Sequence, residues 1–188
     1  MERETEKVEA LALRILKTTH MFDDVILTLK DRPDIQAEDK SWGIEVVRAI
    51  DREAVKAQNV FWNKGKMPHS VPGKIEVDGY EKYDQNGQEY EKMMSIRLCG
   101  IDEFTLTQRC IDQKLKKLKE GNYDGFAKIG LFVFTGVPEP AKEFFVRILE
   151  GYEGPMFDMI FFSDIPHMDA RFHHVSNSLW TITKKELE

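Results

Sequence analysis

The hydrophobic pattern changes its period several times along the first third of the chain. Residues 2–19 carry apolar side chains at three- and four-residue spacing, which is typical of an amphipathic helix. The segments 25–29, 33–38 and 42–48 are short and rich in apolar or β-branched residues, so we predict three consecutive strands. Residues 51–62 return to a helical pattern. The chain is therefore expected to open with a helix, three strands and a second helix.

The pattern is least regular from residue 63 to about residue 104, where glycine, proline and charged residues alternate. We interpret this segment as a long loop, with room for a hairpin, inserted after the third strand. Regular patterns then resume, with helices expected at 105–120 and 140–150 and strands at 129–135, 157–162 and 178–183. Gly121 or Asn122 would end the first of these two helices.

Strands that alternate with helices in this order predict an α/β protein with a mixed sheet flanked by helices. The chain has 188 residues, of which 41% are hydrophobic, and this fits one domain with a core of its own. We therefore predict a single domain over residues 1–188 that carries the insertion at about 63–104.

The composition limits the cell compartment and the binding partners that are expected for this chain. No apolar run approaches the roughly 20 residues of a membrane helix, so no membrane association is expected. The charged first residues do not resemble a secretion signal, and the spacing of Cys99 and Cys110 fits no common zinc pattern. We expect a cytoplasmic protein with reduced cysteines. The net charge of -6 argues weakly against nucleic-acid binding, although a local basic cleft is compatible with an acidic chain.

Candidate chemistry concentrates in residues 31–48. A two-residue turn at Asp39–Lys40, or a four-residue loop around it, pairs Asp34 with Glu45, whereas a three-residue loop does not. Because strand side chains alternate between faces, this register also separates polar from apolar positions. The polar face would hold Asp34, Gln36, Glu45 and Val47, and the apolar face Ile35, Ala37, Ile44 and Val46.

Two carboxylates opposite each other on neighbouring strands lie about 5 Å apart at their Cβ atoms, and their repulsion destabilises the pair. Protonation of one carboxyl, a lysine or arginine between them, or a bound hard cation would offset this repulsion. Mg²⁺ suits carboxylate oxygens and commonly takes only one or two of them from a protein. Asp34 and Glu45 are therefore candidate metal ligands.

The dipeptide Pro33-Asp34, followed by Ile44-Glu45-Val46 in an apolar strand, resembles the motif of the PD-(D/E)xK restriction-endonuclease-like family. The order of the predicted elements is similar to the αβββαβ core of that family over about 5–48 and 105–135. The resemblance implies a nuclease that hydrolyses phosphodiester bonds in DNA or RNA with Mg²⁺ or Mn²⁺. Many proteins of this fold dimerise, so a homodimer is an expectation by analogy.

The resemblance also implies roles for particular residues. Asp34, Glu45 and the main-chain carbonyl of Val46 would bind the metal, and Glu9 on the first helix is the candidate for an additional acidic ligand. The family places a lysine two residues after the glutamate, but this chain has Val47 there. Some members supply the lysine from another element, so we nominate Lys114 first and Gln113 second as replacements.

Two other functions stay open at this point. A nuclease-fold domain that has lost catalysis and serves as an interaction or nucleic-acid-binding module would explain Val47 and the acidic net charge. The other is an unrelated α/β binding protein whose long loop recognises a small molecule or a protein, and a structure with Asp34 and Glu45 far apart would favour it.

Three further groups have a structural and a functional interpretation. The lysines Lys114, Lys116, Lys117 and Lys119 are typical of the solvated face of an amphipathic helix, and could instead meet phosphates. Lys64, Lys66 and Lys74 could do the same, with Phe61 and Trp62 stacking on bases, although packing at a helix end is the favoured interpretation of these aromatic residues. His167, Asp169, His173 and His174 fit a surface loop better than a transition-metal site.

Overall fold

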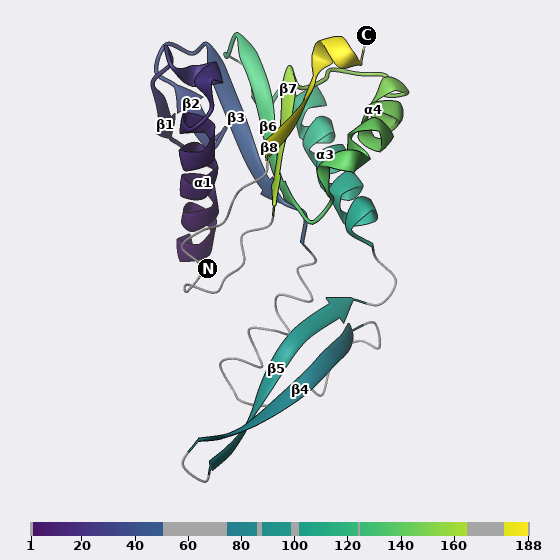
Figure 1. Ribbon diagram of the computed structural model, residues 1–188. Coiled ribbons are helices and arrows are strands. Elements are labelled where there is room, and N and C mark those ends of the chain that lie inside the picture. Colours follow the sequence, from purple (N-terminus) through teal and green to yellow (C-terminus); the bar gives the residue numbers. More distant parts are fainter. Residues whose placement is uncertain are drawn as a thin grey trace. The chain divides into compact units, whose positions relative to one another are not determined.

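In the computed structural model, residues 8–50, 102–123, 125–164 and 179–187 are described with their side chains, and residues 2–7, 75–85 and 88–98 as backbone. The chain divides into two compact units (Figure 1). The first unit joins Met1–Ala49 to Thr107–Glu188, and the second is Ile50–Leu106. The segment 63–104 falls within the second unit, and every candidate site residue falls within the first.

A mixed sheet of six strands forms the centre of the first unit, in the order β1-β2-β3-β6-β7-β8 (Figure 1). The neighbours β3, β6 and β7 are parallel, whereas β1, β2 and β8 each join an antiparallel neighbour. The α/β class and the mixed sheet expected from the sequence are confirmed. The strands are β1 (Leu27–Leu29), β2 (Ile35–Ala37), β3 (Trp42–Arg48), β6 (Lys128–Thr135), β7 (Met159–Asp164) and β8 (Leu179–Thr183).

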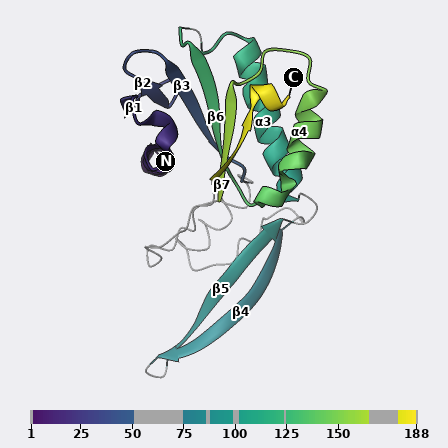
Figure 2. The same cartoon turned by 45° about the horizontal axis from the view of Figure 1, so that its top comes forward.

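Helices cover both faces of this sheet (Figure 2). Helix α1 (Glu2–Lys17) lies on one face, and α3 (Glu103–Lys119) and α4 (Lys142–Glu150) lie on the other. Three short 3-10 helices, His20–Phe22, Glu139–Ala141 and Lys184–Glu186, complete the described helical elements. No helix in the described part of the chain is long and apolar enough to cross a lipid bilayer.

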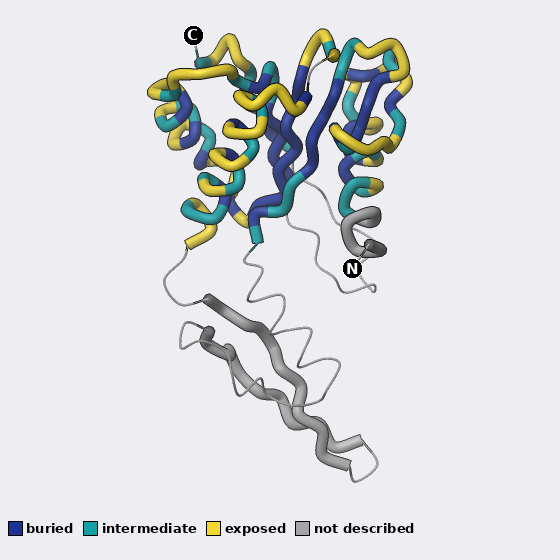
Figure 3. The backbone as a smooth tube through the Cα atoms, turned by 180° about the vertical axis from the view of Figure 1, so that it is seen from behind, coloured by how far each residue is buried: buried dark blue, intermediate teal, exposed yellow. Residues whose placement is uncertain are grey.

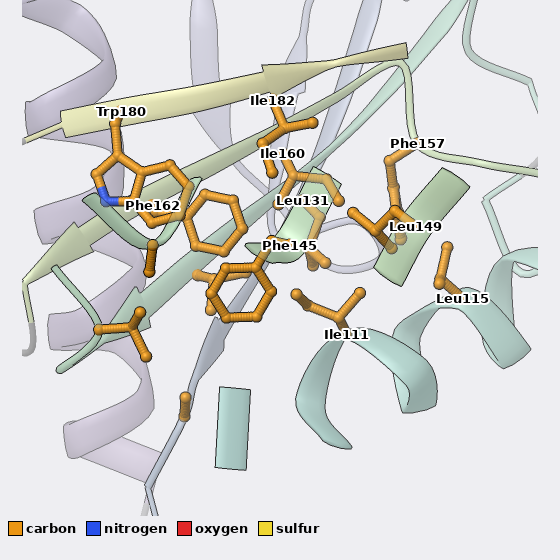
Figure 4. Close-up of a cluster of buried hydrophobic side chains, with 14 of the residues drawn as sticks. Ile111, Leu115, Leu131, Phe145, Leu149, Phe157, Ile160, Phe162, Trp180 and Ile182 are labelled. Carbon is orange, nitrogen blue, oxygen red and sulfur yellow. The ribbon is translucent and has the colours of Figure 1, made fainter. Parts of the chain in front are cut away.

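Each face of the sheet packs into its own apolar core. On the α1 side, Ile35, Ile44 and Val46 pack with apolar residues of the helix. On the α3 and α4 side, the large side chains come from strands and helices together, and Figure 4 shows Phe145, Phe162 and Trp180 in this cluster. Strand β6 is buried from Ile129 onward on both faces, as its continuous apolar run predicts (Figure 3). Burial of large apolar side chains, at roughly 1.5–3 kcal/mol each, stabilises both layers.

Element boundaries agree with the sequence pattern to within two residues, and two of the differences have local reasons. Strand β1 starts later than residue 25 because the Val25 N–H bonds back to the Phe22 carbonyl at 3.0 Å. Strand β7 starts at Met159 rather than 157 because Asp158 is engaged with Ile129. The Asp158 N–H donates to the Ile129 carbonyl at 2.8 Å, and its carboxylate accepts the Ile129 N–H at 2.7 Å.

The second unit contains a long hairpin of β4 (Ile75–Gln85) and β5 (Gln88–Leu98). The two strands pair antiparallel in one register, from Ile75 opposite Leu98 to Gln85 opposite Gln88. The sequence pattern at 63–104 predicted a long loop with room for a hairpin, and this hairpin lies within that segment. The helix expected at 51–62 lies outside the described residues.

Helix α3 ends at Lys119, and the chain then reverses through Gly121, whose φ is +75°. The Gly121 N–H bonds to the Leu118 carbonyl at 3.1 Å, and the Asn122 N–H bonds to the Lys117 carbonyl at 3.3 Å. This pair of bonds is the Schellman arrangement, in which glycine adopts the left-handed conformation without steric cost. It fixes how the chain leaves α3 on its way to β6.

Candidate metal centre

The acidic hairpin has the register that pairs Asp34 with Glu45. Strand β2 pairs with β3 through Ile35 opposite Ile44 and Gln36 opposite Gly43, so the next position along the ladder sets Asp34 against Glu45. The connection is a four-residue loop, residues 38–41, rather than the two-residue turn, and both give the same pairing. Asp39 stabilises the loop, because its Oδ1 accepts the Ser41 N–H at 2.9 Å and the Ser41 hydroxyl at 2.6 Å.

Asp34 is held against β3 by a hydrogen bond to its side chain. Its Oδ2 accepts the Val46 N–H at 2.7 Å, and its own carbonyl accepts the Lys30 N–H at 2.9 Å. The side chain and the main chain of Asp34 are therefore each fixed by a bond to a different segment.

Gln36 braces the segment that leads into Asp34. Its side-chain amide donates to the carbonyl of Pro33 at 3.1 Å and to that of Asp31 at 3.3 Å. Its Oε1 accepts the Lys40 ammonium at 3.0 Å, and the side chain is buried. These three bonds tie Lys40 of the hairpin loop and the segment from Asp31 to Pro33 to one buried amide.

Gly43 allows this dipeptide to approach β3. A Cβ atom at position 43 would lie 2.7 Å from Cγ of Pro33 and 2.9 Å from Cγ of Phe126. Real Cβ atoms do not come so close to ring carbons, so only glycine fits between the two rings. A glycine inside an apolar strand is a sign of such a close backbone approach.

Lys114 reaches Glu45 from helix α3. The Lys114 ammonium donates a short hydrogen bond to Glu45 Oε1, and the two side chains are only 15% and 10% exposed. The lysine nominated first from the sequence is thus the one that the fold brings to the acids. Gln113, nominated second, is exposed to solvent. Val47, at the position where the family has its lysine, packs against the apolar cluster under α3.

The electrostatics of the site follow from burial and like charge. The pKa of Asp34 is raised from 3.8 to about 6, chiefly by burial and then by the negative charge of Glu45. The Val46 N–H and the Lys114 ammonium act in the opposite direction because they favour the ionised carboxylate. With both acids ionised, the single ammonium leaves one negative charge uncompensated, and this excess charge attracts a cation.

Tyr123 joins the site, and sequence reasoning missed it. Its side chain is 4% exposed and packs in the same cluster as Leu115 and Leu131. Leu131 is the residue opposite Glu45 in the parallel ladder of β3 and β6. Burial raises the pKa of the Tyr123 hydroxyl above its usual value, and the neighbouring Glu45 raises it further. Nothing in the local sequence distinguishes this tyrosine from one that only packs.

Glu9 is not grouped with the two acids. It is half-buried on α1, and the apolar residues of that helix pack against the opposite face of the sheet from Lys114 (Figure 2). Within the described ranges, no three His, Cys, Asp or Glu side chains converge to form a metal cluster. The His167 group and the lysines and aromatic residues of 61–74 lie outside those ranges.

The donor set still fits a hard divalent cation. Mg²⁺ keeps several of its waters and commonly uses one or two protein carboxylates, so Asp34 and Glu45 suffice for that chemistry. Val46 supplies its N–H to Asp34, which leaves its carbonyl as the main-chain oxygen next to the glutamate. Thiolate and imidazole ligands are not part of the set, which favours Mg²⁺ or Mn²⁺ over zinc.

Comparisons with known proteins add no relative to this picture. No protein-family model, no curated protein and no solved structure matches the chain. The hairpin, Lys114 and the chemistry of the groups around them are therefore the features that point to a function.

Proposed function

We propose that this protein is a divalent-metal-dependent nuclease of the PD-(D/E)xK type, which hydrolyses phosphodiester bonds in DNA or RNA. One observation carries the proposal: the Lys114 ammonium contacts Glu45, which faces Asp34 across the hairpin. Two carboxylates with a lysine beside them are the set of groups that the motif requires. The order α1, β1, β2, β3, α3 and β6 supports the proposal because it follows the αβββαβ core.

Lys114 supplies the positive charge that Val47 cannot. A lysine at position 47 would point to the same face of β3 as Glu45, because side chains two residues apart share a face. Lys114 reaches that face from α3 instead, and its amine ends at Glu45 Oε1. The position of the charge relative to the acids is therefore retained, while the element that carries it differs.

The proposed reaction assigns separate tasks to the three groups. Asp34 and Glu45 hold the metal, which when bound would lower the pKa of a coordinated water and neutralise charge on the phosphate. Lys114 donates hydrogen bonds to the attacking water and to the phosphate oxygens as negative charge develops. The bond from the Val46 N–H keeps Asp34 oriented, so the carboxylate needs no rearrangement before it binds.

The proposal is tested by measuring Mn²⁺ binding calorimetrically and cleavage of labelled single- and double-stranded DNA and RNA. Asp34→Asn and Glu45→Gln should each weaken Mn²⁺ binding by at least tenfold, and Lys114→Met should reduce cleavage by about 100-fold or more. Lys116→Met is the matched control, since Lys116 is exposed on the same helix. Wild-type protein that binds no Mn²⁺ and cleaves none of the substrates would refute the nuclease assignment.

An inactive nuclease-fold module is the second candidate, and Val47 at the position of the family's lysine favours it. It predicts that nucleic acid binds without being cut, with an affinity that falls as salt is raised. The position of Lys114 favours the nuclease over this module, because it keeps a positive charge beside the two acids, where the motif requires one. Binding without cleavage at any Mn²⁺ concentration would select this second function.

A further inference from the structure

Lys40 lies in the loop of the acidic hairpin and has a left-handed backbone. Its φ is +62°, a conformation in which a residue with a Cβ atom is disfavoured and glycine or asparagine is usual. The Lys40 N–H donates to the Ala37 carbonyl at 3.1 Å, and the Lys40 carbonyl accepts the Ala127 N–H at 3.0 Å. A glycine would form both bonds without strain, so the main chain does not explain why a lysine stands here.

Two contacts fix the side chain of Lys40 on the face of the candidate metal centre. Its Nζ donates to Gln36 Oε1 at 3.0 Å and lies 4.5 Å from the centre of the Phe126 ring. Gln36 is opposite Gly43, one step of two residues along the hairpin from the pair Asp34 and Glu45, so all four positions share a face. Two residues of a strand span about 7 Å, so the ammonium is held about that far from the acids, toward the loop.

The partners of Lys40 leave its charge uncompensated. Among the described contacts they are an amide and an aromatic ring, which carry no charge, whereas Lys114 is paired with the carboxylate of Glu45. An ammonium has three N–H donors, and Gln36 accepts from one of them. Lys40 is exposed, yet its side chain is already ordered, so little conformational entropy is lost when it binds a ligand. It therefore offers a fixed positive charge to an anion from solution.

We infer that Lys40 binds a backbone phosphate of a nucleic acid, next to the phosphate at the candidate metal centre. The inference rests on the proposed function for the identity of the ligand. The excess negative charge of Asp34 and Glu45 repels a polyanion, and the charge of Lys40 beside them offsets this repulsion. Contacts to backbone phosphates fix the register of a strand without reading its sequence, so Lys40 is a positioning residue for the substrate.

The salt dependence of binding tests this role. Fluorescence anisotropy measures the affinity for a labelled single-stranded DNA and for an RNA of the same sequence over a range of KCl concentrations, in EDTA so that no metal supports cleavage. Lys40→Met should weaken binding by about tenfold. It should also reduce the slope of log affinity against log salt by about 0.7, the value for one phosphate contact on a single strand. Lys40→Arg keeps the charge and should retain the wild-type slope.

Lys128→Met is the matched control. The Lys128 ammonium also lies over an aromatic ring, 5.2 Å from the centre of Trp42, its neighbour in the sheet. Trp42 packs with the core on the α1 side, so this lysine is on the opposite face from Glu45. Lys128→Met should therefore leave both the affinity and the slope unchanged. An equal reduction of the slope by Lys128→Met and Lys40→Met would reflect the net charge alone and would overturn the inference.

A lysine that only braces the hairpin would not change the number of phosphates in contact. A wild-type slope in Lys40→Met, with or without a loss of affinity, would therefore overturn the inference and leave the nuclease proposal intact. Wild-type protein that binds neither strand would overturn it as well, and Mn²⁺ binding and cleavage would still decide the nuclease proposal. If Mn²⁺ binding and cleavage are absent, the slopes still decide whether Lys40 contacts a phosphate.

Discussion

Glu45 and Lys114 are 69 positions apart in the chain, yet the lysine ammonium donates to the glutamate carboxylate in a largely buried pair. One residue comes from the middle of β3 and the other from α3, so the contact exists only after the helix has packed on the sheet. Two buried charges of opposite sign lose their hydration on folding, and each needs the other. The pair therefore couples the chemistry of the site to the stability of the fold.

Removal of Lys114 should destabilise the protein strongly. Lys114→Met leaves Glu45 buried without a charged partner, and we expect the free energy of unfolding to fall by about 3 kcal/mol. Lys116→Met on the same helix should change it by no more than about 0.5 kcal/mol. Urea denaturation at neutral pH measures both values. A loss below 1 kcal/mol for Lys114→Met would mean that water replaces the ammonium as the partner of Glu45.

Replacement of both partners should cost less than replacement of one. Apolar side chains of similar volume need no hydration, so the double variant Glu45→Leu with Lys114→Met should recover most of the stability lost in Lys114→Met. The measurement is again urea denaturation, with the two single variants alongside. Additive losses in the double variant would show that Glu45 and Lys114 do not stabilise each other.

Cation binding should depend on pH through Asp34. Its pKa lies at about 6, and a proton on this carboxyl competes with a metal for the same oxygens. The affinity for Mn²⁺ should therefore rise as pH increases up to this pKa and level off above it. Calorimetric titrations across that range test the dependence, with Asp39→Asn as a control because Asp39 serves the hairpin loop. An affinity that keeps rising well above that pKa would assign the competing proton to another group.

Much of this site could be predicted from the sequence, because the hairpin encodes its own register. The alternation of Ile35 and Ala37 with Asp34 and Gln36 fixes which side chains share a face, and any loop of two or four residues then pairs Asp34 with Glu45. A resemblance to a known motif pointed to Lys114, and the packing of α3 put it in place.

Other parts of the site depend on contacts that no local pattern contains. Tyr123 packs in the cluster with Leu115 and Leu131 because the chain reverses at Gly121 after α3, and no pattern around position 123 predicts this. The start of β7 shifted because one carboxylate, that of Asp158, bonds to the backbone of β6. Glu9 illustrates the converse: its place on the first helix suggested a ligand, but α1 packs on the other face of the sheet.

Stability should fall with rising pH because of Asp34. Its pKa is about 6 in the folded protein and 3.8 as a free side chain, so between these values the folded state holds a proton that the unfolded state has released. Stability is highest below the lower value, decreases as pH rises through the folded pKa, and is constant above it. The difference between wild type and Asp34→Asn in denaturant titrations isolates this contribution. A difference that does not vary from pH 4 to pH 7 would contradict the raised pKa.

Gly43→Ala should disturb the site through packing alone. The added Cβ would meet Pro33 at 2.7 Å and Phe126 at 2.9 Å, so the dipeptide that carries Asp34 must move away from β3. We expect a loss of about 1–3 kcal/mol in unfolding free energy, the usual cost of overpacking, together with weaker Mn²⁺ binding. Gly151→Ala is the matched control, because its φ is -85° and the nearest atom to a Cβ there is 3.8 Å away. If Gly43→Ala proved as stable as Gly151→Ala, the close approach of Pro33 to β3 would not be what positions Asp34.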